Sequence, residues 1–342
     1  MHGEFNKYAS IMDKLNLSGD EKLFLAQKFE EFPRVREGFE MFTNTHPVQR
    51  IQLAVSILNT QPRTGWLRFN IVQDPKDILA TRAKEYKGSS FLMFEEVASV
   101  VETVLEHSAE AGDLYALIYK RFDTPTELQW GNEVLKFHDF AEAIIGDFTP
   151  NDPISREDKI RLEGIAIELL TQSRDHGDLL ALHIYHCLQI YEGNITDFEV
   201  TKKAIMDEVS RQESEGLIKP HQTSVVEFFR GLYNTQDIDL ARLRKQTKDM
   251  DVLQMSVRGV RIIHDGHAQR PEFEARQEMQ EFWEYIDKKL ETEQARNLFS
   301  ELKYLYDNEP EMASKKVIPL ACFLMENAPV DMSRTAMCRK LI

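Results

Sequence analysis

Cysteine is scarce in this chain, and its placement excludes one kind of site. Only three cysteines occur among 342 residues, at Cys187, Cys322 and Cys338, and none has a partner at C-x-x-C spacing. This spacing provides no sulfur metal site, and scattered cysteines are typical of proteins in a reducing compartment. We therefore expect the protein in the cytoplasm.

Long apolar runs and an excess of basic residues are also missing. No stretch of about 18 apolar residues predicts a membrane span, and the first residues lack the apolar segment of a signal peptide. The formal charge is -15, from 42 Lys and Arg against 57 Asp and Glu. That balance argues against a surface for duplex nucleic acid and against a polybasic membrane anchor. A small anionic substrate stays open, because salt screens distant charges from a local basic cluster.

The alternating pattern of β-strands is absent, and apolar residues recur with helical spacing instead. With 42% hydrophobic residues the chain can bury a substantial core. We predict an all-α fold, with a helical extension over residues 1–48, a core over 49–270 and a second extension over 271–342. An amphipathic run through Phe24, Leu25, Phe29 and Phe32 marks the first extension as a packing element.

Four polar side chains interrupt the apolar helical run from residue 137 to 147: His138, Asp139, Glu142 and Asp147. Burying them together is costly unless a metal, hydrogen bonds or mutual contacts satisfy them. On a helix His138 and Glu142 share one face, whereas Asp139 lies about 100° around the axis from His138. The adjacent pair can therefore reach one metal only from a helix end or from a helix that lines a cavity.

Three further segments occur in order around this run. They are Arg63-Thr64-Gly65-Trp66, Glu106-His107-Ser108 and Lys248-Asp249-Met250-Asp251-Val252-Leu253-Gln254-Met255. Together with the run from His138 to Pro150, they resemble the HD-domain metal-dependent phosphohydrolases, specifically the branch that includes 5′-deoxynucleotidases. The resemblance spans residues 50–265 and implies an HD-domain helical core. It also implies inserted helices near 70–98 and 195–245, where the spacing between motifs is longer than the family has.

The resemblance implies that one divalent cation binds to His107, His138, Asp139 and Asp251. Imidazole and carboxylate ligands without thiolates suit Mn, Co, Fe, Zn, Ni or Mg and do not choose among them. Tyr191-Glu192-Gly193 resembles the family element that comes shortly before the last aspartate, and Asp207, which lies nearer to it in sequence, is the alternative last ligand. Without a metal, His138 and Asp139 would be a buried hydrogen-bonded pair, and Asp251 a solvated helix acid.

The remaining site residues are also implied by the resemblance. Glu142 would orient the attacking water or transfer a proton to the leaving oxygen, with Asp147 as the second acid-base candidate. Arg63 would hold the phosphate through its fork of donors, and Trp66 would pack on the sugar or form the pocket wall. The alternative for Arg63 and Trp66 is a turn with an aromatic plug into the core.

The implied function is hydrolysis of the 5′-phosphate of (deoxy)nucleoside monophosphates. Two alternatives stay open. A nucleotide triphosphohydrolase or pyrophosphohydrolase is favoured if the first insertion brings Arg82, Lys84 and Lys87 over the pocket. A non-catalytic nucleotide-binding or scaffold protein that retains the HD fold is the other. We expect a nucleotide or another small phosphate ester as partner, with no duplex nucleic acid and no membrane, and a homo-oligomer stays open.

Other histidines and aromatics have simpler interpretations. His183 and His186 are spaced i and i+3, which is more often an ordinary helix face than a metal site. The pair His264-Asp265 falls after the last expected ligand and is interpreted as a coincidence. The stripe Phe228-Phe229-Tyr233 is interpreted as core or interface.

Overall fold

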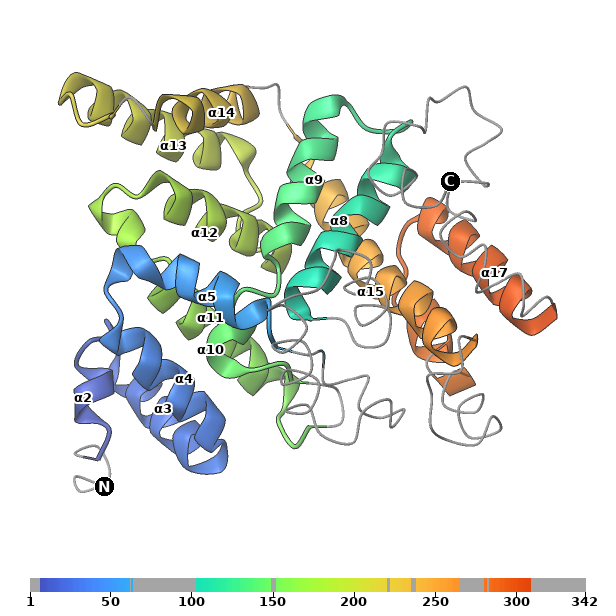
Figure 1. The fold of residues 1–342 in the computed structure, drawn as a ribbon, viewed down its shortest axis with the longest axis horizontal. Helices are drawn as coiled ribbons and strands as arrows, with labels where there is room; N and C mark the ends of the chain where they lie inside the picture. The colour runs from blue at the N-terminus through green and yellow to red at the C-terminus, as the bar shows by residue number, and fades with distance from the viewer. Residues whose placement is uncertain are drawn as a thin grey trace, which may run out of the picture. The chain divides into compact units, whose positions relative to one another are not determined.

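The computed structural model describes residues 7–61, 63, 103–148, 152–219, 222–234, 238–264, 280–281 and 283–308. Every regular element in these ranges is a helix, which confirms the predicted all-α class (Figure 1). None of the helices in the described ranges combines the length and the apolar character needed to span a bilayer.

The chain forms two compact units. Unit 1 consists of Met1–Gln61, Phe137–Gln189 and Glu199–Asn234, and unit 2 of Pro62–Lys136, Ile190–Phe198 and Thr235–Ile342. The domain boundaries expected after residues 48 and 270 stay a prediction. The insertion expected near 70–98 lies outside the described residues. The one expected near 195–245 covers two helices and the start of a third, all named below.

Unit 1 is built from short and medium helices that are far apart in sequence. They are α2 (Ala9–Met12), α3 (Gly19–Glu31), α4 (Pro33–Asn44), η1 (Pro47–Gln49), α5 (Arg50–Leu58), α10 (Glu142–Ile145), α11 (Arg156–Leu170), η3 (Gln172–His176), α12 (Leu179–Glu192), α13 (Phe198–Ser214) and α14 (Thr223–Tyr233). The last three residues of α12 and the first residue of α13 belong to unit 2. Helix α3 starts with a capping box in which Ser18 and Glu21 satisfy each other's backbone. Phe24, Leu25 and Phe29 from the predicted amphipathic run are buried.

The N-terminal helices of unit 1 support the segment that holds the acidic residues. Helix α4 packs against α10, whose first residue is Glu142. Gly38 allows this approach, because a Cβ atom there would lie 1.9 Å from the carbonyl oxygen of Ile144. Arg50, 3% exposed, donates to the carbonyl oxygens of Phe42 and Leu169 at 2.8 and 2.9 Å. Helix α4 and Arg50 therefore help to hold α10 and α11 in place within unit 1.

We expect Gly38→Ala to lower the free energy of unfolding by about 1–3 kcal/mol, the usual cost of overpacking a tight interface. The backbone oxygen of Ile144 cannot rotate away, so α4 and α10 must separate. Gly164→Ala is the matched control, because Gly164 lies within α11 with no atom within 4 Å of the added Cβ. It should stabilise by roughly 0.5–1 kcal/mol through helix propensity. Urea denaturation checks both values, and equal stability of the two variants would contradict the described packing.

Unit 2 contains α8 (Val104–Tyr119), α9 (Pro125–Phe137), α15 (Leu240–His264) and α17 (Glu293–Asn308), with α9 extending one residue beyond it. The long helix α15 packs against both α8 and α17. Asp249 on α15 is buried and accepts hydrogen bonds from the backbone N–H groups of Glu291 and Thr292, each at 2.8 Å, and from the Thr292 hydroxyl at 2.6 Å. This carboxylate fastens the start of α17 to α15.

The run from residue 137 to 147 is not one helix. Helix α9 ends at Phe137, residues 138–141 form turns, and α10 spans only Glu142–Ile145. The shared face expected for His138 and Glu142 is therefore not a helix face. Instead, the His138-Asp139 pair directly follows a helix end, which is one of the two placements that allow adjacent His and Asp side chains to reach one metal.

Candidate metal centre

His107 lies in the first turns of α8, where a capping box fixes the helix start. The Glu106 carboxylate accepts from the Thr103 backbone N–H at 2.7 Å, and the Thr103 hydroxyl accepts from the Glu106 N–H at 3.1 Å. This reciprocal pair satisfies two N–H groups that a helix start leaves without helical partners. The His107 side chain that follows is fully buried.

Asp251 on α15 faces His107. Its Oδ1 lies 3.0 Å from Nε2 of His107, although 144 positions separate the two residues in sequence. Its Oδ2 accepts a hydrogen bond of 2.5 Å from the Tyr191 hydroxyl. The carboxylate is thus held at both oxygens, with 20% of the side chain exposed.

Helix α15 also holds the segment that carries Tyr191. Arg244 donates from Nε to the Tyr191 carbonyl oxygen at 3.0 Å, and Lys248 Nζ lies 3.3 Å from the Tyr191 ring centre. The same ammonium is 3.3 Å from the Glu192 carboxylate. The sequence marked Tyr191-Glu192-Gly193 only as an element that comes before the last aspartate, and no spacing rule linked its hydroxyl to Asp251.

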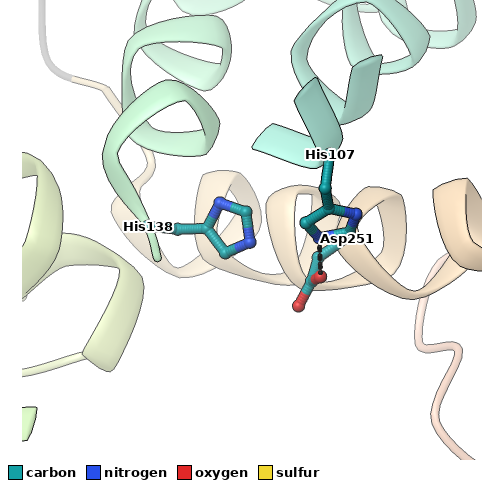
Figure 2. A group of neighbouring side chains, drawn as sticks. All are labelled: His107, His138 and Asp251. Carbon is teal, nitrogen blue, oxygen red and sulfur yellow. Dashed lines mark hydrogen bonds and ion pairs between the residues drawn. The ribbon is translucent and has the colours of Figure 1, made fainter. Parts of the chain in front are cut away.

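The second part of the site follows α9. His138 is 6% exposed, and its Nε2 lies 3.2 Å from Oδ2 of Asp139. Among the described residues, one group of three ligand side chains comes together: His107, His138 and Asp251, each offering one atom within 4.8 Å of the others (Figure 2). Asp139 is outside this group of three. Two imidazoles and a carboxylate are a donor set that suits a divalent transition metal.

The surroundings of His107 fit a cation. Its Nε2 faces the Asp251 carboxylate, and its Nδ1 faces the side-chain oxygen of Gln254 at 2.5 Å. A neutral imidazole carries only one N–H, so it cannot donate to oxygen acceptors on both sides. With the N–H of Nδ1 donated to Gln254, a cation would satisfy the lone pair of Nε2 together with Asp251. The residues present therefore fit a metal ion held between imidazole and carboxylate.

The ammonium group of Lys159 lies among several acids of unit 1. Lys159 on α11 lies 4.0 Å from the Glu142 carboxylate and 3.5 Å from that of Glu163. Burial lowers the pKa of Lys159, but nearby carboxylates outweigh burial and leave this pKa raised above its usual value; in order of strength they belong to Glu142, Glu163, Asp139 and Asp147. Lys159 thus stays charged next to both acid-base candidates, and no sequence motif had singled it out.

Asp147 follows a turn that is held from two sides. Gly146 has φ of 84°, a conformation that glycine adopts without strain, and its N–H bonds the Glu142 carbonyl oxygen at 2.8 Å. Lys159 donates to the Phe148 carbonyl oxygen at 3.0 Å, and the Arg34 guanidinium stacks 4.2 Å from the Phe148 ring centre. Asp147 is 4% exposed, so the turn keeps this carboxylate inside unit 1.

Of the remaining predicted site residues, the structure describes Arg63 and Asp207 but not Trp66. Arg63 donates to Met255 Sδ at 3.8 Å, which puts its guanidinium beside the helix that carries Asp251. Trp66 lies outside the described residues. Asp207 is exposed on α13, and the group of three described above contains Asp251 instead. This geometry favours Asp251 over Asp207 as the last ligand.

His183 and His186 form a buried cluster in unit 1 and are absent from the group of three ligands. The Tyr233 hydroxyl lies 2.8 Å from His183 Nδ1 and 3.2 Å from His186 Nδ1, and Cys187 Sγ lies 3.7 Å from His183 Nε2. One hydroxyl can donate to one ring and accept from the other. The tyrosine of the aromatic stripe therefore has a polar role inside the core. His264 is the last residue of α15, and the residues that follow it lie outside the described ranges.

This cluster predicts acid sensitivity. Burial, aided by the electrostatic effects of the neighbouring His183 and Arg174, lowers the pKa of His186 to about 3. Because this pKa is depressed in the folded state, the resulting stability is present above the unfolded value near 6.5 and is lost as the pH falls towards 3. The slope contributed is up to about 1.4 kcal/mol per pH unit. Urea denaturation between pH 7.5 and 4.5 should show a shallower loss of stability for His186→Gln than for wild type, and parallel curves would contradict the assignment.

Comparisons with known proteins identify relatives of one kind. The chain is 27% identical over 140 residues to the 5′-deoxynucleotidase YGK1 of Saccharomyces cerevisiae, which is 40% of this chain and 51% of the relative. It is 28% identical over 118 residues to the 5′-deoxynucleotidase hdd1 of Schizosaccharomyces pombe, 34% of this chain and 44% of the relative. The matches thus span about half the length of these relatives. No family model and no solved structure matches the chain.

The fold, the group of ligand side chains and the relatives agree at a coarse level. The described residues contain a candidate metal site at His107, His138 and Asp251, and the relatives carry the names of phosphate-removing enzymes. In particular, the chain is similar to proteins named 5′-deoxynucleotidase.

Proposed function

We propose that this protein is a metal-dependent phosphohydrolase of the HD superfamily that removes the 5′-phosphate from (deoxy)nucleoside monophosphates. The observation that carries the proposal is the approach of His107, His138 and Asp251 from three distant parts of the sequence. The similarity to two proteins named 5′-deoxynucleotidase supports the substrate class.

The proposed ligands are His107, His138, Asp139 and Asp251. When bound to them, a divalent cation supplies a water of lowered pKa and neutralises charge on the phosphoryl group. Asp139 is included because its Oδ2 lies 3.2 Å from Nε2 of His138, one of the three clustered ligand side chains.

The proton-handling role falls to Glu142. Its carboxylate is 3% exposed at the start of α10, and Lys159 stands 4.0 Å away. A carboxylate shielded from bulk solvent in this way can orient the attacking water and pass a proton to the leaving 5′-oxygen. Asp147 is the second acid-base group, held by the Gly146 turn.

Arg63 is the proposed phosphate-binding residue, because its planar guanidinium can donate two parallel hydrogen bonds to a phosphate. Its position beside Met255 places it next to the helix that carries Asp251. Trp66 is proposed to pack on the sugar. A reducing, cytoplasmic setting, predicted from the cysteine pattern, belongs to the same proposal.

The test is a phosphate-release screen of the purified full chain over deoxy- and ribonucleoside mono- and triphosphates, with Mn²⁺, Co²⁺ or Mg²⁺ added. Release of inorganic phosphate from monophosphates is the expected result. Triphosphate or pyrophosphate released from triphosphates would instead favour the triphosphohydrolase alternative, so the products are analysed by anion exchange. A metal-loaded protein that hydrolyses nothing in the screen would contradict enzymatic activity and favour the nucleotide-binding alternative.

A further inference from the structure

Two side chains on α8 and α15 form a hydrogen-bonded relay behind His107. Gln254 is 2% exposed, and its side-chain oxygen lies 2.5 Å from Nδ1 of His107. Its Nε2 donates to the Glu110 carboxylate at 2.7 Å. His107 and Glu110 are spaced i and i+3 on α8, as are Asp251 and Gln254 on α15, so both pairs present neighbouring side chains on one helix face.

The relay fixes which ring nitrogen carries the proton. An ionised carboxylate only accepts hydrogen bonds, so Glu110 requires the NH₂ group of Gln254 on its side. The amide oxygen must then face His107. Because this oxygen is an acceptor, it selects the imidazole tautomer that is protonated at Nδ1. Nε2 consequently carries the lone pair, and it points to the Asp251 carboxylate 3.0 Å away.

We propose that Gln254 and Glu110 are positioning residues that hold His107 with Nδ1 protonated, so that the lone pair of Nε2 is presented to the divalent cation. This inference rests on the metal centre of the proposed function. Partners behind a metal-binding histidine set its tautomer and ring orientation, and their loss typically weakens metal binding 10–100-fold. Neither residue touches the ion or the substrate in this proposal.

The first experiment compares Co²⁺ affinity in competition with a fluorescent chelator. Q254M keeps the length of the side chain but removes both hydrogen bonds, and it should weaken Co²⁺ binding about 10–100-fold. The double variant E110Q/Q254E exchanges amide and carboxylate, so an acceptor still faces Nδ1. Its Co²⁺ affinity should stay within about threefold of wild type, because the hydrogen bond to Nδ1 is kept. Q280M is the matched control, because Gln280 pairs with Glu284 on an exposed surface.

Three results would overturn the inference. One is wild-type affinity in Q254M. Another is equal weakening in Q254M and E110Q/Q254E, which would show a role in packing alone. The third comes from the metal-free wild type, where ¹⁵N spectra of histidine-labelled protein, assigned with His107→Asn, should show Nδ1 of His107 protonated; an unprotonated Nδ1 contradicts the relay even if Q254M does not fold.

Failure of the proposed function gives a different pattern. Wild type that binds Co²⁺ but releases no phosphate removes the enzymatic proposal and leaves the relay intact. Wild-type protein that binds no Co²⁺ would overturn the metal centre, and with it the proposed binding of the cation by Nε2 of His107.

Discussion

Asp251→Ala should remove bound divalent metal and lower phosphate release roughly a thousandfold or more, since a metal supplies several kcal/mol of transition-state stabilisation in such sites. The variant deletes the carboxylate that faces His107 at 3.0 Å and that Tyr191 holds at 2.5 Å. Metal content after gel filtration and initial rates of phosphate release measure the two effects. They should fall together, because the same atoms serve both.

Asp207→Ala is the decisive control for this substitution. Asp207 was the alternative last ligand, yet it is exposed on α13. Replacing the Asp207 carboxylate with the alanine methyl group should leave metal content and the rate of phosphate release within about twofold of wild type. Substitutions at exposed positions away from a site have little effect on stability. If Asp207→Ala lost the metal and Asp251→Ala kept it, the assignment of the last ligand would be reversed.

Glu142→Gln should lower kcat by about 10²–10⁴ while leaving metal affinity unchanged, because general acid-base catalysis contributes this much. The amide keeps the shape of the side chain but cannot exchange a proton. Phosphate release at saturating substrate gives kcat, and a Co²⁺ titration gives the affinity. A parallel loss of metal would mean that Glu142 acts as a ligand instead.

Glu163→Gln separates proton transfer from charge compensation. Glu163 lies 3.5 Å from the same Lys159 ammonium that faces Glu142 at 4.0 Å. Both variants therefore remove one negative charge next to Lys159. Only Glu142→Gln should change kcat strongly, and equal losses in the two variants would assign the effect to the charge balance around Lys159.

The sequence predicted the class of fold and several chemical residues because both leave local signals. Helical spacing of apolar residues predicted the all-α class, and the structure confirmed it. Short motifs selected His107, His138 and Asp251, which the structure brings together. Motifs report residue type and order, so they selected candidate ligands without showing which atoms of these residues face one another.

Features that depend on tertiary contacts were not accessible from sequence. Apolar spacing predicted one helix through residue 138, and the turn at 138–141 that presents His138 became visible only in the fold. Lys159 is an ordinary lysine in sequence, and its importance arises from acids that surround it in unit 1. Gln254 gives no signal either, because the acceptor role of its amide oxygen depends on Glu110 in another helix. The predicted domain boundaries and the role of Trp66 stay predictions.

Asp249 and Asp251 together fix the rotation of helix α15 about its own axis. The two carboxylates are about 200° apart around the helix axis. One holds the backbone at the start of α17, and the other faces His107. A turn of α15 about its own axis would detach both at once, so a one-residue insertion between them would misalign either the C-terminal helix or the metal ligands. Attachment of α17, which carries no site residue, therefore helps to keep Asp251 facing His107.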